Sequence, residues 1–167
     1  MNGKIVYQGV SKSGTPIVIR YPVIEDLDPM LNYMNSISQE QTYISYQGEQ
    51  ISREDEEKYL KDVLKKIVSK KAVKLVVYSD NDFIGTSDIE LGSRISSHVG
   101  VFGISIADGF RGEGIGKKLM EMVLEEAEQN MPDLKIVTLG IFSNNLQAYK
   151  LYQEFGFKEY GNLPEGV

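Results

Sequence analysis

The most informative stretch of the chain is ISIADGFRGEGIGKKLMEMVLEEA, residues 104–127. Its pattern predicts the end of a strand, a turn and the start of a helix. Three glycines alternate within it, at Gly112, Gly114 and Gly116. Glycine has no side chain to block a ligand and tolerates positive φ, so successive backbone N–H groups can point at one anion. The N-terminus of a helix adds a partial positive charge. The segment therefore predicts an anion-binding loop that opens a helix.

Two other phosphate-binding motifs do not fit this loop. A P-loop requires glycine at the position of Arg111, and serine or threonine at the position of Lys118. A dinucleotide-binding loop requires a third glycine where Leu119 or Lys117 stands. Arg111 and Lys117 instead place full positive charges at the rim of the loop. A nucleotide phosphate-binding protein is therefore disfavoured.

A second segment, SNNLQAYKLYQEFGFKEYG at 143–161, complements the glycine loop. The loop contains Arg-x-x-Gly-x-Gly, and the second segment contains Asn-x-x-Ala-x-x-Leu-Tyr followed by Gly-Phe, at Asn145, Ala148, Leu151, Tyr152, Gly156 and Phe157. In this order and at this separation, the two motifs resemble those of the GNAT superfamily of N-acetyltransferases. The resemblance covers most of the chain, and the first fifty residues match least. It implies that the loop binds the pyrophosphate of coenzyme A and that acetyl-CoA is the co-substrate.

The remaining sequence predicts an α/β (α+β) fold in one domain, residues 1–167. Apolar runs and turn signals predict strands over 16–21, 72–78, 83–91, 98–107 and 135–142. Helical spacing predicts helices over 25–36, 53–69, 115–129 and 144–155. Ser52 is expected to cap the second helix, and Gly156 is expected to end the last. The resemblance implies the GNAT fold, a central mixed, mostly antiparallel twisted sheet flanked by about four helices.

Composition excludes several classes of site and partner. The 167 residues include no cysteine and one histidine, which excludes a cysteinyl intermediate and a multi-histidine metal site, so no metal is expected. The net charge of −6 disfavours nucleic acid as a partner. No apolar run could span a membrane, and the N-terminal segment has no signal-peptide pattern. A cytoplasmic protein with a small-molecule amine or a protein amino group as acceptor is expected.

The resemblance also implies how coenzyme A is held. Its pantetheine is expected to pair with the backbone of the strand before the loop, as an added strand would. Asn145 is expected to lie near the pantetheine, although an N-cap role suits an Asn-Asn pair equally well. The expected cofactor-binding residues are Ile104, Ser105, Ile106, Arg111, Gly112, Gly114, Ile115, Gly116, Lys117, Asn145 and Tyr152.

For the chemistry, the resemblance implies that Tyr152 is the general acid that protonates the leaving thiolate. A phenol with an ordinary pKa of about 10 suits that task; the alternative is a tyrosine that only packs in the core. Relatives often carry a glutamate base on the strand before the loop, but Val101 or Phe102 stands there in this chain. Glu90 on the preceding strand is the substitute base, and Asp88 lies on the same face of that strand. The alternatives are that these carboxylates are only solvated, that His98 accepts the proton, or that a water chain leads it to a backbone carbonyl.

The acceptor pocket is expected from the first two helices and the loop 37–50, with Tyr43, Tyr46 and Glu49 as lining residues. A non-catalytic acyl-CoA-binding sensor of the same fold is the alternative to an active enzyme. The tail 158–167 reads as turn, whereas family members usually continue into one more strand, so the C-terminal strand is expected to be absent or truncated. An exposed strand edge tends to pair with another chain, which predicts a homodimer.

Overall fold

A single twisted sheet with helices on both faces forms the core of the computed structural model, which describes residues 1–41, 43 and 46–164. The strands are β1 (Ile5–Val10), β2 (Pro16–Arg20), β3 (Ala72–Ser79), β4 (Asp82–Leu91), β5 (Val99–Ile106) and β6 (Ile136–Thr138). The α-helices are α1 (Leu27–Gln39), α2 (Arg53–Val68), α3 (Ile115–Asn130) and α4 (Leu146–Glu154). Two 3-10 turns, Ile24–Asp26 and Arg94–Ser96, complete the regular structure of the described residues.

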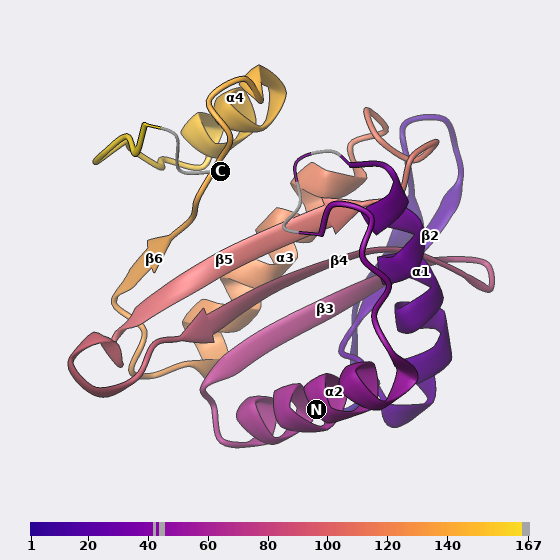
Figure 1. Cartoon of the computed structure of the whole chain (residues 1–167), viewed down its shortest axis with the longest axis horizontal. Helices are drawn as coiled ribbons and strands as arrows, with labels where there is room; N and C mark the ends of the chain where they lie inside the picture. Colours follow the sequence, from indigo (N-terminus) through magenta and orange to yellow (C-terminus); the bar gives the residue numbers. More distant parts are fainter. Residues whose placement is uncertain (42, 44–45, 165–167) are drawn as a thin grey trace.

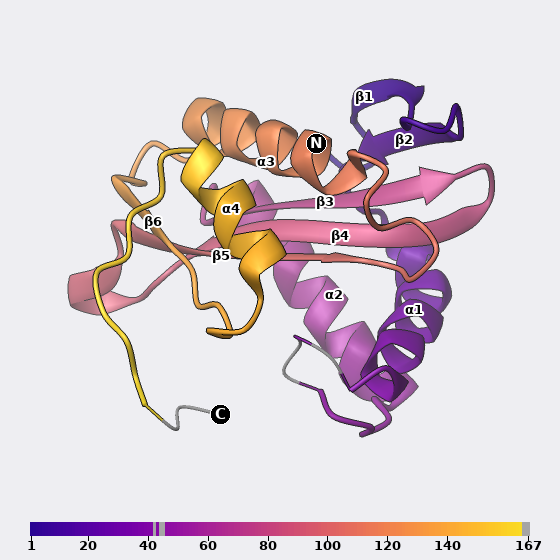
Figure 2. The ribbon, with the colours of Figure 1, turned by 90° about the horizontal axis from the view of Figure 1, so that it is seen from above.

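The strands lie in the sheet in their sequence order, β1-β2-β3-β4-β5-β6. Neighbouring strands are antiparallel, except for the parallel pair of β5 and β6. Helices α1 and α2 cover one face of the sheet, and α3 and α4 cover the other (Figures 1 and 2). The predicted mixed, mostly antiparallel α/β architecture with about four helices is therefore confirmed.

Most predicted elements are found, with three differences. β1 was not predicted, because Gln8 and Gly9 interrupt its apolar pattern and its stability comes from pairing with β2. The strand predicted over 135–142 is wrong in length, because pairing with β5 ends at Thr138 and the chain then leaves the sheet. The last helix begins at Leu146, two residues later than predicted, because Asn145 is its N-cap.

Two predicted helix boundaries are confirmed by their hydrogen bonds and dihedral angles. The Asp55 N–H donates to Ser52 Oγ at 3.1 Å, so Ser52 caps α2. Gly156 follows α4 with φ of +84°, the left-handed conformation that ends a helix most easily with glycine. Within the described residues, no helix is both long and apolar enough to cross a membrane.

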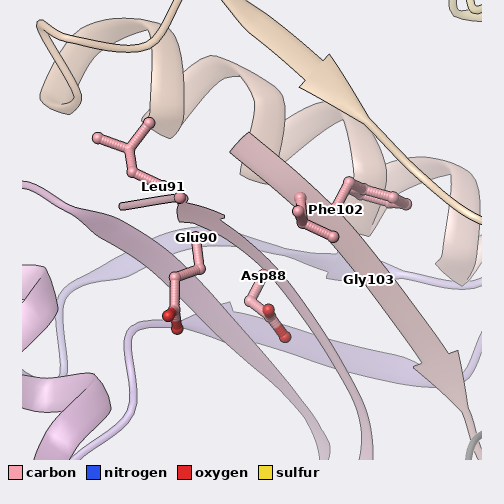
Figure 3. A pocket seen from close by; sticks show the side chains of 7 residues that line it. Asp88, Glu90, Leu91, Phe102 and Gly103 are labelled. Carbon is pink, nitrogen blue, oxygen red and sulfur yellow. The ribbon is translucent and has the colours of Figure 1, made fainter. Parts of the chain in front are cut away.

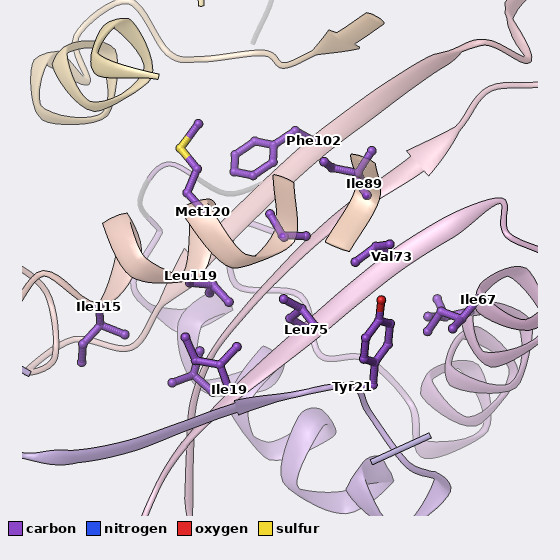
Figure 4. Packing of buried hydrophobic residues seen from close by; sticks show 14 of the residues in the cluster. Ile19, Tyr21, Ile67, Val73, Leu75, Ile89, Phe102, Ile115, Leu119 and Met120 are labelled. Carbon is purple, nitrogen blue, oxygen red and sulfur yellow. The ribbon is translucent and has the colours of Figure 1, made fainter. Parts of the chain in front are cut away.

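The main hydrophobic core lies between the sheet and α3. Alternate residues of β3 face α3, where Leu75 packs against a cluster that includes Leu119 and Met120 (Figure 4). At one end of this interface Tyr21 donates its hydroxyl to Glu126 Oε2 at 2.8 Å, which ties α3 to the end of β2. The core thus holds α3, and with it the glycine loop that precedes α3, at a defined place beside β5.

Candidate active site

The glycine loop connects β5 to α3 through backbone conformations that favour glycine. Gly109, Gly112 and Gly114 have φ of +82°, +79° and +80°, and Gly114 is the N-cap of α3. L-residues with a side chain rarely adopt such angles. Three of the loop glycines are therefore required by the local backbone itself.

The hairpin between β1 and β2 supports the loop from one side. The Lys12 N–H donates to the Glu113 carbonyl at 3.0 Å, and the Ser13 N–H donates to Glu113 Oε2 at 2.8 Å. Hydrogen bonds from Ser13 and Ser11 hold the pKa of Glu113 below its ordinary value. The acidic residue inside the loop is thus turned toward the hairpin and away from the amides.

The backbone amides of the loop and of the first turn of α3 remain available for a ligand. Within the described part of the chain, no N–H from Arg111 to Lys117 donates to a protein acceptor. A Cβ placed on Gly112 would meet no atom within 4 Å, and one on Gly116 would meet only Ile106 Cγ1 at 3.8 Å. Open space in front of unpaired amides at a helix N-terminus is the arrangement that binds phosphate. The site fits the pyrophosphate expected from the sequence.

The two cations at the rim already have partners in the protein. Arg111 donates through Nε to the Ile106 carbonyl at 2.8 Å and through Nη2 to Glu40 Oε2 at 2.5 Å. Lys117 Nζ lies 2.7 Å from Glu154 Oε2. Both side chains stay largely exposed, so they add positive charge at the rim, but an anion would have to compete with these ion pairs.

The sheet opens beside the loop, between β5 and β6. The two strands pair from Val99 to Val101 of β5, and Figure 1 shows the chain after β6 turning away from β5. Beyond Val101, the edge of β5 that faces β6 has no strand partner among the described residues. This free edge contains Ile104, Ser105 and Ile106, the residues expected to pair with pantetheine. The Ser105 side chain itself accepts a hydrogen bond from Tyr33 on α1, at 2.9 Å between the hydroxyls.

Helix α4 brings Tyr152 to the same opening. Its ring lies edge-on to Phe102, the first β5 residue beyond the pairing with β6, with 6.0 Å between ring centroids. Burial raises the pKa of Tyr152, and its hydroxyl has no hydrogen-bond partner among the described residues. Asn145 caps α4 by accepting from the Ala148 N–H at 3.2 Å. Tyr152 therefore both packs against the core and presents an unpaired phenol.

The candidate base Glu90 and its neighbour Asp88 line an open cavity of about 330 Å³ on the surface of the paired strands β4 and β5. Figure 3 shows both carboxylates extending to the same side of β4. Glu90 Oε1 is 2.6 Å from Lys66 Nζ, and Asp88 Oδ1 is 3.1 Å from Lys74 Nζ. Each carboxylate already forms an ion pair with a lysine. The side chains of Glu90 and Asp88 are nevertheless 39% and 34% exposed, so each can bind a second cation.

Three further residues, which were not predicted from the sequence, lie around the candidate site. Lys74 is buried within β3, Gly103 lies opposite Asp88 in the register of β4 and β5, and Phe142 follows β6. The charge of Lys74 within the apolar run AVKLVVY was the one available signal. The positions of the other two depend on strand register and on packing between distant segments.

The predicted acceptor loop lies partly outside the described residues, which omit 42, 44 and 45. Tyr43 stacks at a tilt on Phe142, with 5.7 Å between ring centroids, so this loop reaches the segment after β6. Tyr46 is exposed, and Glu49 accepts a hydrogen bond from the Gln47 N–H. Among the described residues, no group of three or more acidic or histidine side chains is placed to hold a metal ion.

A strand, a glycine loop at a helix N-terminus and a sheet that opens beside them define an α/β protein with a candidate site for a phosphate-bearing ligand. The chain belongs to the acetyltransferase (GNAT) family, whose sequence model matches residues 32–157. The resemblance inferred from the two sequence motifs is thereby confirmed.

Similar proteins agree with this family. The chain is 36% identical over 58 residues to the spermine/spermidine N(1)-acetyltransferase of Bacillus subtilis (strain 168), over 35% of this chain and 38% of that protein. It is 31% identical over 88 residues to the L-amino acid N-acetyltransferase AaaT of Escherichia coli (strain K12), over 52% and 54%. Both matches span less than two thirds of the relative. A GNAT-family acetyltransferase structure from Streptococcus pneumoniae shares the fold, with a TM-score of 0.82 and 24% identity over 90% of each chain.

Proposed function

We propose that the protein transfers the acetyl group of acetyl-CoA directly to a primary amine, in a ternary complex with both substrates. The observation that carries the proposal is the unpaired amides of residues 111–117 behind the open space at Gly116. Gly116 has neither positive φ nor a close neighbour that requires glycine, so a ligand that approaches the backbone explains it best. The free edge of β5 continues from this loop and offers the pantetheine its main-chain partners.

Tyr152 is the proposed acid for the transfer. The amine nitrogen attacks the thioester carbonyl, the carbon–sulfur bond breaks, and the thiolate takes the phenolic proton. Because burial raises the pKa of Tyr152, the hydroxyl stays protonated at neutral pH and can donate. Glu90 is the proposed base that receives the amine proton, since it faces the cavity opposite Val101, where pairing with β6 ends.

The acceptor is proposed to be a small amine or polyamine, with a protein amino group as the second candidate. The polyamine acetyltransferase of Bacillus subtilis and the acidic cavity beside the opening of the sheet support the first. The similarity to the L-amino acid N-acetyltransferase AaaT of Escherichia coli supports including amino acids among the acceptors tested.

A thiol-release assay with acetyl-CoA and a panel of amines, amino acids and peptides tests this proposal. Wild-type protein is expected to release thiol with at least one acceptor. Gly116→Ala is expected to weaken acetyl-CoA binding about tenfold or more, because its methyl group fills the space before the amides, while the free energy of unfolding stays equal or rises by up to about 1 kcal/mol. Gly140→Ala, also in open space but outside the loop, is the control.

Coenzyme A binding without thiol release from any acceptor would favour the non-catalytic sensor. Unchanged acetyl-CoA affinity in Gly116→Ala would contradict the placement of the pyrophosphate at this loop.

A further inference from the structure

The cavity on the surface of β4 and β5 contains a second carboxylate beside the proposed base. It is lined by Asp88, Glu90, Leu91, Gly92, Val101, Phe102 and Gly103. Two of these residues are carboxylates, placed two positions apart on one strand and therefore about 7 Å apart along it. Glu90 lies opposite Val101, the last β5 residue paired with β6, and Asp88 lies opposite Gly103. The cavity is thus lined by two carboxylates, one level with the end of the β5–β6 pairing and one two residues beyond it.

Asp88 forms an ion pair with the buried ammonium group of Lys74. Lys74 Nζ, whose side chain is 4% exposed, contacts Asp88 Oδ1 at 3.1 Å and the Tyr59 hydroxyl at 3.0 Å. Burial lowers the pKa of Lys74, but the neighbouring Asp88 and Tyr59 raise it further, so the lysine remains charged. Asp88 Oδ2 has no hydrogen-bond partner among the described residues. One carboxylate oxygen is therefore anchored, and the other is available to the cavity.

Gly103 leaves Asp88 uncovered. A Cβ at this position would come within 3.9 Å of Asp88 Oδ1 and of no other atom within 4 Å. Any larger side chain there would stand over the carboxylate. The glycine has no positive φ, so the local backbone does not require it. Glycine at this position leaves space beside the Asp88 carboxylate.

The charges around the cavity remain unbalanced. Lys66 is shared by Asp62 and Glu90, at 2.6 Å from each, while Lys74 serves Asp88. Three carboxylates thus share two ammonium groups. Buried Glu56 adds a fourth carboxyl near Lys74, with Oε1 unpartnered among the described residues and a pKa that burial raises. Attraction to these carboxylates would offset the desolvation of an additional cation.

We infer that Asp88 binds a second ammonium group of the acceptor, one spacer away from the amine that reacts near Glu90. The inference rests on the proposed acetyl transfer and narrows its acceptor to aliphatic diamines and polyamines. The anchored carboxylate accepts the distal ammonium as a charged hydrogen bond, and Gly103 provides the room for it. An amine with a single ammonium group cannot form this hydrogen bond to Asp88.

Acetylation kinetics with spermidine and with butylamine separate the two positions. In Asp88→Asn, KM for spermidine is expected to rise about 10- to 100-fold, the equivalent of one charged hydrogen bond. KM for butylamine, kcat and acetyl-CoA affinity are expected to change less than about threefold. Asp82→Asn, an exposed aspartate at the start of the same strand, is the control and is expected to change nothing.

Gly103→Val provides a second route, because it adds bulk beside Asp88 and keeps both the carboxylate and Lys74. It is expected to raise KM for spermidine selectively, as Asp88→Asn does. Equal increases for both amines in either folded variant, or no increase, would overturn the inference.

The test also separates this inference from the proposed function. If the wild-type protein releases no thiol with any amine, acetyl transfer fails, and calorimetric binding of spermidine to the coenzyme A-loaded protein decides the inference. Binding that is lost in Asp88→Asn supports it, and the absence of wild-type binding overturns it.

Discussion

Tyr152 packs in the core and also carries the phenol that we propose as the general acid. Its ring packs against Phe102 and Phe157, while its hydroxyl has no hydrogen-bond partner in the described part of the chain. Burial raises the pKa of the phenol above its ordinary value of about 10. A general acid must be protonated before it acts, so this shift extends the acid form over a wider pH range. Ionisation of the Tyr152 phenol is therefore not expected to lower kcat at mildly basic pH.

Tyr152→Phe is expected to lower kcat by roughly 100-fold or more, because the leaving thiolate loses its proton donor. Acetyl-CoA affinity should stay within about twofold, since the ring and its packing are retained. Steady-state kinetics together with calorimetry distinguish the two effects. Tyr149→Phe, on the same helix with a more exposed side chain, is the matched control. Equal losses of kcat and of acetyl-CoA affinity would argue that Tyr152 only supports the binding site.

At the scale of the elements, a buried ion pair joins β2 to α1. Arg20 at the end of β2 donates to Asp26 through two nitrogens, at 2.8 and 2.6 Å. The Tyr78 hydroxyl and the Val23 N–H donate to the same carboxylate, at 2.6 and 2.8 Å. Burial alone would raise the pKa of Asp26, but the hydrogen bonds from Arg20, Tyr78 and Val23 outweigh it and lower the pKa. The ionised form of Asp26 therefore stabilises the folded state.

Asp26→Asn is expected to reduce the free energy of unfolding at pH 7 by about 3–5 kcal/mol, because it leaves a partly buried arginine without its partner. Because the folded pKa of Asp26 is lowered, the stabilisation is present above the unfolded value of about 3.9 and is lost as pH falls through the folded value. The difference between variant and wild type should therefore shrink below pH 4 in urea unfolding.

Asp28→Asn is the control for this measurement. Asp28 forms an exposed ion pair with Arg53, at 2.8 Å, so the unfolding midpoint should hardly move. A difference between Asp26→Asn and wild type that stays constant from pH 7 to pH 3 would contradict the role assigned to the Asp26 carboxylate.

At the scale of the whole molecule, β6 is an open edge of the sheet. It pairs with β5 on one side and with no strand on the other, within the described residues, and 157–164 form no strand. Nearby, Ile136 and Leu146 are exposed by 49% and 66%. Free strand edges and exposed apolar side chains both favour association.

A homodimer whose partner covers the β6 edge is therefore expected. Light scattering at micromolar concentration should give twice the 18.8 kDa of one chain. Ile136→Lys should shift the mass toward the monomer, because it places a charge on the edge strand. A monomeric mass for the wild-type protein would rule the dimer out.

Most helices and the central strands could be predicted because their signals are local. Ser52 caps α2 through a neighbour three residues away, and the apolar stripe of α3 lies within one helix. β1 could not be predicted in this way, since its pairing with β2 supplies its stability. The length of β6 was overestimated because the apolar run continues after the sheet has parted.

The proposed donor side of the site could be predicted from the sequence, because the loop consists of consecutive backbone groups around Gly112, Gly114 and Gly116. The surroundings of the proposed acceptor cavity became apparent from the folded structure. The anchoring of Asp88 by Lys74, the gap that Gly103 leaves over it, and the contact of Tyr152 with Phe102 join segments that lie far apart in the chain. Strand register and helix packing bring these side chains together, and both depend on the whole fold.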